Sequence, residues 1–175
     1  MQLQPGWNAL FVTDWSGRYV DESGSSRKIS NLEDRQTFLR LRKSADVIVT
    51  TAATVRQEKY TKVDYAPIYI LSSSGDVPDS SLGEVLQIKE PIFDELTQRL
   101  QSDGHRVFFY EGGPRLFKHL EQTNQPATIW LTIVGEPQGG ANSADVLEGL
   151  GFDQSWQLRN FYQDGPNLVS QWQRP

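Results

Sequence analysis

The chain of 175 residues contains no cysteine and only two histidines. The absence of cysteine excludes disulfide bonds, thiolate metal sites and catalysis by a thiol, and it is typical of proteins in a reducing compartment. His105 and His119 are not spaced as metal ligands on one helix, and the sequence has no H-x-E segment. We therefore expect no metal site, which disfavours a zinc hydrolase or a zinc-dependent deaminase.

The sequence also lacks long apolar segments and an excess of positive charge. No apolar run approaches the roughly 20 residues that span a bilayer, and the first residues lack a basic stretch followed by an apolar one. We therefore expect a cytoplasmic protein with no membrane partner. The formal net charge of −5 disfavours general nucleic-acid binding. An acidic protein that binds a phosphorylated ligand must gather its cations locally, and such a cluster is formed by Arg27, Lys28, Arg40, Arg42 and Lys43.

Short apolar segments of strand length alternate with segments of helical pattern along the chain. Strands are expected at 7–13, 46–51, 67–71, 106–110 and 127–134. The turn sequence at 164–167 predicts an antiparallel pair formed by 156–162 and 168–172. This order predicts a single domain over residues 1–175. Its fold class is α/β, a three-layer, mostly parallel sheet with an antiparallel C-terminal edge and helices on both faces.

The first helix has a clear start signal. Ser30-Asn31-Leu32-Glu33 is a capping box, in which the serine hydroxyl bonds the third helical N–H and the glutamate reaches back. The helix is expected to run to about Lys43, where its dipole favours cations. Its expected apolar stripe consists of Leu32, Phe38, Leu39 and Leu41.

Two strand ends carry residues suited to ligand binding. Glu111-Gly112-Gly113-Pro114 follows an apolar strand, and its glycines allow close approach of a ligand to the backbone. Thr51-Ala52-Ala53-Thr54 is a second strand-to-helix turn with small side chains. The alternatives are a tight turn in the first case and N-capping by Thr51 in the second. Because ligands of such sheets bind outside the carboxyl ends of the strands, both turns are expected to line one cleft.

Taken together, these segments resemble the reductase domain of the bifunctional riboflavin-biosynthesis deaminase/reductase, and most closely its stand-alone pyrimidine-reductase branch. The family pattern has S-x-x-I-[ST], a helix ending in L-R, a strand leading to T-V and R-x-E-x-Y, and later E-G-G-P and a Gly-Gly loop. The matching segments here are Ser26–Ser30, Leu41-Arg42, Asp46 through Thr54-Val55, Arg56–Tyr60, Glu111–Pro114 and Gly139-Gly140.

The resemblance implies a dihydrofolate-reductase-like fold and an activity. In that family, hydride from NADPH reduces the ribose C1′ of a 5-phosphoribosylamino-pyrimidine to the ribitylamino product of riboflavin biosynthesis. The phosphorylated substrate, the cofactor NADPH and a homodimer are therefore expected. Position by position, the resemblance assigns Ser26, Arg42 and Glu111 to the substrate, with Arg42 on the phosphate. It assigns the cofactor to Lys28, Thr54, Glu58, Ser73, Gly113, Pro114, Arg115 and Leu116.

Three departures from the family pattern favour alternatives to an active pyrimidine reductase. The strand end S-x-D-G reads Asp14-Trp15-Ser16-Gly17 here, so Asp14, the candidate catalytic acid beside Glu111, lies two positions early. The cofactor-side glycine is replaced within 50–53, and the segment 76–90 is short, with 84–88 as a possible strand. The alternative is therefore a catalytically degenerate, ligand-binding or regulatory member of the same fold. A reductase of a folate or another carbonyl substrate is a third interpretation.

Overall fold

A computed structural model describes residues 2–58, 60–89, 93–136 and 142–174. The strands are β1 (Gly6–Asp14), β2 (Val47–Thr51), β3 (Ile68–Ser72), β4 (Glu84–Gln87), β5 (Val107–Glu111), β6 (Ala127–Val134), β7 (Gln157–Asp164) and β8 (Asn167–Arg174). The α-helices are α1 (Leu32–Arg42), α2 (Ala52–Gln57), α3 (Phe93–Ser102), α4 (Pro114–Phe117) and α5 (Ser143–Gly149). Two short 3₁₀ helices, η1 (Ser80–Leu82) and η2 (Lys118–Gln122), are also present in the described ranges.

The eight strands form one sheet in the order β4-β3-β2-β5-β1-β6-β8-β7. The strands from β4 to β6 are parallel, and the hairpin of β7 and β8 adds the antiparallel edge. The predicted α/β fold and the predicted C-terminal hairpin are therefore confirmed. The carboxyl ends of β1, β2 and β5 meet at one edge of the sheet, because these strands are parallel neighbours through β5.

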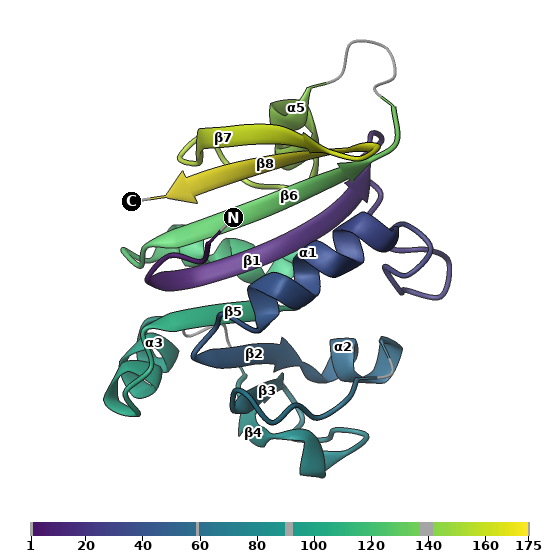
Figure 1. The fold of residues 1–175 in the computed structure, drawn as a ribbon. Coiled ribbons are helices and arrows are strands. Elements are labelled where there is room, and N and C mark those ends of the chain that lie inside the picture. Colours follow the sequence, from purple (N-terminus) through teal and green to yellow (C-terminus); the bar gives the residue numbers. More distant parts are fainter. Residues whose placement is uncertain (1, 59, 90–92, 137–141, 175) are drawn as a thin grey trace.

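Helices cover both faces of this sheet (Figure 1). Helices α1 and α2 lie on one face, where Leu41 and Val55 belong to two small buried clusters. Helices α3, α4 and α5 lie on the other face over the main core, which includes Leu100, Phe117 and Leu147. Trp130 is 3% exposed, as expected for a core residue. No helix in the described ranges combines the length and the apolar character needed to cross a membrane.

Helix α1 differs from its expected pattern. Asn31, not Ser30, is the N-cap, and its side chain accepts a hydrogen bond from the backbone N–H of Asp34. Ser30 bonds the Asp34 carboxylate instead. The expected apolar stripe is confirmed at Leu41 but wrong at Leu32 and Leu39, which are 67% and 38% exposed. The helix instead buries a mixed face made of Asp34, Thr37, Leu41 and Arg42.

Two further elements complete the sheet and its cover. The segment expected as a possible strand at 84–88 is β4, a parallel edge strand beside β3. Helix α5 was not expected from the sequence, although Asn142 and Asp145 form a capping box at its start. Neither element lies at the carboxyl ends of β1, β2 and β5.

Candidate functional site

A cleft of about 980 Å³ opens at the carboxyl ends of β1, β2 and β5. Helix α1, the β1–α1 loop, helix α2 and the turn after β5 form its walls. Ligand pockets commonly have volumes of about 300–1,000 Å³, so this cleft is at the large end of that range. The residues assigned above that line it are Ser26, Arg42, Thr54, Glu58, Glu111, Gly113, Pro114 and Arg115. The structure therefore brings the basic segment and the diglycine turn into one cavity.

The floor of the cleft holds a buried ion pair. Arg42 Nε lies 2.5 Å from Glu111 Oε1, and both side chains are less than 10% exposed. The Tyr60 hydroxyl donates to Glu111 Oε2, and the Arg42 guanidinium lies 5.0 Å from the centre of the Tyr60 ring. A second hydroxyl, that of Tyr65, accepts from Arg42 at 3.3 Å. Arg42 and Glu111, both expected on the substrate, thus bind each other.

Burial and charge act in opposite directions on this network. Burial disfavours the charge on Arg42, but Glu111 and Tyr60 together outweigh this effect and raise the pKa of Arg42. Burial also raises the pKa of Glu111, and the Arg42 charge and the Tyr60 hydroxyl offset part of that rise. Burial, followed by the negative charge of Glu111, raises the pKa of Tyr60, so this hydroxyl stays protonated and is a hydrogen-bond donor.

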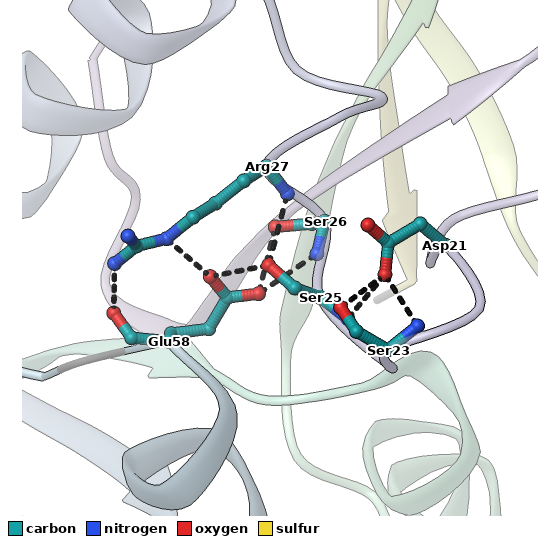
Figure 2. Close-up of polar contacts among 6 residues, drawn as sticks. All are labelled: Asp21, Ser23, Ser25, Ser26, Arg27 and Glu58. Carbon is teal, nitrogen blue, oxygen red and sulfur yellow. Dashed lines mark hydrogen bonds and ion pairs between the residues drawn. The ribbon is translucent and has the colours of Figure 1, made fainter.

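The β1–α1 loop is tied to the end of α2 by Glu58 (Figure 2). The carboxylate accepts from the Ser26 backbone N–H at 2.8 Å and from the hydroxyls of Ser25 and Ser26, each at 3.1 Å. Arg27 adds a bond from Nε to the carboxylate and another to the Glu58 carbonyl. Within the same loop, bonds from Ser23 lower the pKa of Asp21 to about 2. Ser26 and Glu58, expected on substrate and cofactor, therefore hold each other and shape the wall of the cleft.

We predict that Glu58→Ala releases this loop. The variant loses several hydrogen bonds to a charged acceptor, each of which contributes about 1.5–3 kcal/mol. Because proteolysis tracks the population of the open form, trypsin cleavage after Arg27 or Lys28 should accelerate at least about tenfold, as measured by mass spectrometry. Glu22→Ala is the matched control, since Glu22 is an exposed residue of the same loop. Equal cleavage rates in the two variants would contradict the anchoring role.

The diglycine turn after β5 combines a crowded glycine with an open one. A Cβ at Gly112 would lie 2.3 Å from the hydroxyl oxygen of the buried Tyr110, so no side chain fits there. A Cβ at Gly113 would meet no atom within 4 Å. Gly113 is also the N-cap of the four-residue helix α4 and makes no side-chain cap bond. The backbone at Gly113 is thus open to the cleft, and the exposed Arg115 lies beside it.

Other assigned residues lie away from the cleft. Lys28 is exposed and pairs with Asp21 at 3.5 Å, whereas Ser73 is exposed beyond β3. Leu116 packs against the main core. The Trp15 indole donates to the Gly135 carbonyl at 2.7 Å and is not part of the lining, so it leaves the cavity open. The Gly139-Gly140 segment falls outside the described residues.

Asp14 does not line the cleft either. Its carboxylate accepts from the Ser16 hydroxyl at 2.6 Å and pairs with Arg18 at 2.9 Å. Burial opposes ionisation, but the hydrogen bonds from Ser16 and Arg18 outweigh it and lower the pKa of Asp14. An acid that is ionised at neutral pH and paired in a local turn is poorly suited to proton donation.

Several lining residues were not identified from the sequence, and three of them are Tyr60, Arg35 and Asp34. The sequence analysis used Tyr60 only as the last residue of the R-x-E-x-Y motif. A tyrosine hydroxyl after a polar turn can donate a hydrogen bond at a strand-end site, and this signal could have identified it. Arg35 is exposed and lines the cleft. Its guanidinium carbon lies 5.4 Å from the centre of the Phe38 ring. Asp34 is a buried carboxyl in the first turn of α1. An acidic residue in the first turn of a helix is usually solvated and interacts favourably with the helix dipole. The sequence therefore provided no signal that Asp34 is buried.

Comparisons with known proteins agree with this geometry. Residues 16–170 match the family described as the RibD C-terminal domain. No curated protein sequence matches the chain significantly.

Among solved structures, the chain is similar to a pyrimidine reductase-like protein from Corynebacterium diphtheriae, at 18% identity over 96% of this chain and 91% of that one, with a TM-score of 0.69. It is also similar to the Thermotoga maritima diaminohydroxyphosphoribosylaminopyrimidine deaminase/5-amino-6-(5-phosphoribosylamino)uracil reductase. That match has 13% identity and a TM-score of 0.66, and it covers 98% of this chain but 57% of that one. A dihydrofolate reductase from Enterococcus faecalis, complexed with NADP(H), matches at 15% identity over 96% and 94% of the two chains, with a TM-score of 0.60. At these identities the likeness shows the fold, which is dihydrofolate-reductase-like as expected.

Proposed function

Because the chain belongs to the RibD C-terminal domain family, we propose that it is an NADPH-dependent reductase of a 5-phosphoribosylamino-pyrimidine. Hydride would pass to the ribose C1′ of the substrate and give the ribitylamino product. The observation that carries this proposal is a large cleft that joins Arg42 and Glu111 to the open turn at Gly113. Two ligands must lie side by side for hydride transfer, and the cavity volume suits such a pair.

The residues present fit the cofactor on the side of the diglycine turn. NADPH would supply the hydride, and the protein would supply orientation and electrostatics. Ala53 and Gly113 leave room for a flat ring or a phosphate against the backbone, and Thr54 presents a hydroxyl there. Arg115 is a cation of this wall for which the structure gives no partner among the described residues. The cofactor roles of Lys28 and Ser73 remain predictions that this arrangement does not support.

The substrate would occupy the side of the cleft near α1. Arg42 keeps its charge in this setting because Glu111 compensates it, and a phosphate would have to compete with that carboxylate. The exposed Arg35 is a second cation on the same wall. Glu111 would accept hydrogen bonds from the sugar, with Tyr60 holding the other carboxylate oxygen. The homodimer remains a prediction, for which the exposed Leu158 and Phe161 on edge strand β7 are the candidate contacts.

The activity is tested by NADPH oxidation in the presence of the phosphoribosylamino-pyrimidine. Oxidation that depends on this substrate would support the proposal. The second candidate, a ligand-binding protein without catalysis, is favoured by one observation, the position of Asp14 outside the cleft. NADPH binding without substrate-dependent oxidation would select this second candidate. Absence of NADPH binding at millimolar concentration would remove the reductase proposal.

We predict that Gly113→Val weakens NADPH binding without affecting the fold. The backbone at Gly113, with φ −72° and ψ 157°, accepts a β-branched residue, and the new side chain would enter open space. A ligand that approaches this backbone would be displaced, so the dissociation constant for NADPH should rise at least about tenfold, equivalent to 1.4 kcal/mol. Fluorescence titration measures the affinity, and thermal denaturation checks the fold.

Gly149→Val is the matched control for this experiment. Gly149 ends α5, lies outside the cleft and has no atom within 4 Å of an added Cβ. Its NADPH affinity should equal that of the wild type. Unchanged affinity in Gly113→Val as well would contradict cofactor binding at this turn.

A further inference from the structure

Tyr110 lies beneath the diglycine turn, on the face of the sheet that α4 covers. It is 1% exposed and belongs to the main core. Its hydroxyl donates a hydrogen bond to the Gly113 carbonyl at 3.3 Å. Burial raises the pKa of Tyr110, so the hydroxyl stays protonated and remains a donor. One buried side chain thus binds the backbone of a turn that lines the cleft.

The same side chain also contacts the residues on both sides of Gly113. A Cβ at Gly112 would lie 2.3 Å from the Tyr110 hydroxyl oxygen, so glycine is needed above it. The Tyr110 ring packs against the Phe117 ring of α4, with the ring centres 5.2 Å apart. Helix α4 has four residues and no side-chain cap, so it is too short to be stable without such tertiary contacts. Tyr110 therefore positions the turn and the helix that follows it as one unit.

The hydrogen bond from Tyr110 determines where the Gly113 carbonyl points. Tyr110 is not part of the cleft lining, so the carbonyl that accepts from it faces the core. Backbone dipoles act as fixed partial charges, and a carbonyl oxygen that faced the cleft would repel an anionic ligand. Because the ring of Pro114 fixes its φ, this carbonyl can turn outward only if the start of α4 moves with it. The bond thus keeps a repulsive oxygen away from the open backbone at Gly113.

Removal of the Tyr110 hydroxyl would take this donor away from the Gly113 carbonyl. A buried carbonyl that loses its donor is unfavourable, and it regains hydrogen bonds by turning toward water. Water is available on the side of the cleft, where a Cβ at Gly113 would meet no atom within 4 Å. The two glycines give the turn the backbone freedom for this movement. The net contribution of one neutral hydrogen bond corresponds to about a two- to tenfold change in such an equilibrium.

We propose that Tyr110 is a positioning residue for the cofactor. Its hydroxyl holds the diglycine turn in the orientation that accepts a phosphate of a dinucleotide, and it does so without touching the ligand. The inference rests on the proposed function, which places NADPH at this turn. It also explains why a hydroxyl stands at a core position of β5 where packing requires only an apolar ring.

The test compares Tyr110→Phe with the control Tyr69→Phe. Each variant keeps a buried aromatic ring and loses one hydroxyl, which donates to Gly113 in the first case and to Asp103 in the second. Tyr69 is 6% exposed and lies outside the cleft. Fluorescence titration measures NADPH affinity at a temperature at which all the proteins are folded. We expect the dissociation constant to rise about three- to tenfold in Tyr110→Phe and to equal that of the wild type in Tyr69→Phe.

Three further measurements separate positioning from a general structural role. The double variant Tyr110→Phe/Gly113→Val should bind NADPH no more weakly than Gly113→Val alone, because both changes act on the same turn. Without ligand, the NMR amide resonances of Gly112 and Gly113 should shift or broaden in Tyr110→Phe and stay unchanged in Tyr69→Phe. In the substrate-dependent assay, KM for NADPH should rise in Tyr110→Phe by the same factor as the dissociation constant, whereas kcat should change less than about twofold.

The outcomes separate this inference from the proposed function. Equal NADPH affinity in Tyr110→Phe and the wild type would overturn the role of Tyr110 and leave the reductase proposal standing. Additive losses in the double variant would also overturn it, because Tyr110 would then act elsewhere. NADPH binding that depends on Tyr110, without oxidation in the presence of substrate, would refute the reductase and support the inference. If the wild type does not bind NADPH, both fail.

Discussion

Arg42→Ala is expected to lower the free energy of unfolding by about 3–5 kcal/mol. The substitution leaves the Glu111 carboxylate buried at the end of β5 with no cation beside it. It also removes the guanidinium that packs over the Tyr60 ring. Urea denaturation at pH 7 measures the loss. The effect on substrate affinity must then be read at a temperature where the variant is folded.

Two variants test this explanation of the Arg42 effect. Arg40→Ala removes an exposed arginine from the same helix and should change stability by no more than about 0.5 kcal/mol. The double variant Arg42→Met/Glu111→Leu removes both charges and should regain most of the lost stability, because apolar residues replace buried ion pairs at little cost. A single variant as stable as the wild type would show that Glu111 does not depend on Arg42.

Asp34→Asn is expected to act in the opposite direction and to raise the stability at pH 7 by about 1–3 kcal/mol. The amide has the same shape and carries no charge, so the penalty for burying a carboxylate disappears. Its N–H₂ group can donate to the hydroxyl of Thr132, which neighbours the Asp34 carboxylate. Urea denaturation measures the gain, and a variant no more stable than the wild type would contradict this account.

The pH dependence of this gain has a definite sign. The pKa of Asp34 is raised in the folded protein, so the ionised wild type is disfavoured at neutral pH. The stability difference between Asp34→Asn and the wild type should be largest above the folded-state pKa. It should shrink as the pH falls through that value and vanish below the unfolded value of about 3.9. A difference that grows on acidification would contradict this account of Asp34.

The sheet and the place of the cleft could be predicted because both follow from local patterns. Apolar segments such as 127–134 identify strands, and the rule for parallel sheets places ligands at their carboxyl ends. Helix α5 was not predicted, because its seven residues contain too few apolar positions to show a helical pattern. The cap of α1 was assigned one residue early, because Ser30 and Asn31 are both good N-cap residues and only the fold decides between them.

The partners of the site residues could not be predicted. Arg42 and Glu111 are 69 positions apart, and a basic residue at a helix end is equally consistent with binding a phosphate or a carboxylate. The same limit applies to Ser26 and Glu58, whose mutual bonds arise only when the loop folds over α2. Sequence patterns identify the residue types that meet at the cleft, whereas their pairing depends on tertiary distances.

The insertion of β5 between β1 and β2 has a consequence for how this protein is made. The two strands follow each other along the chain, yet each is hydrogen-bonded to β5 and not to the other. A nascent chain that has emerged from the ribosome only as far as α3 therefore lacks the strand that joins β1 to β2. It also carries the Arg42 charge before its counter-ion exists. Vectorial synthesis must leave the first hundred residues incompletely folded, and assembly of the sheet centre must wait until Glu111 has been translated.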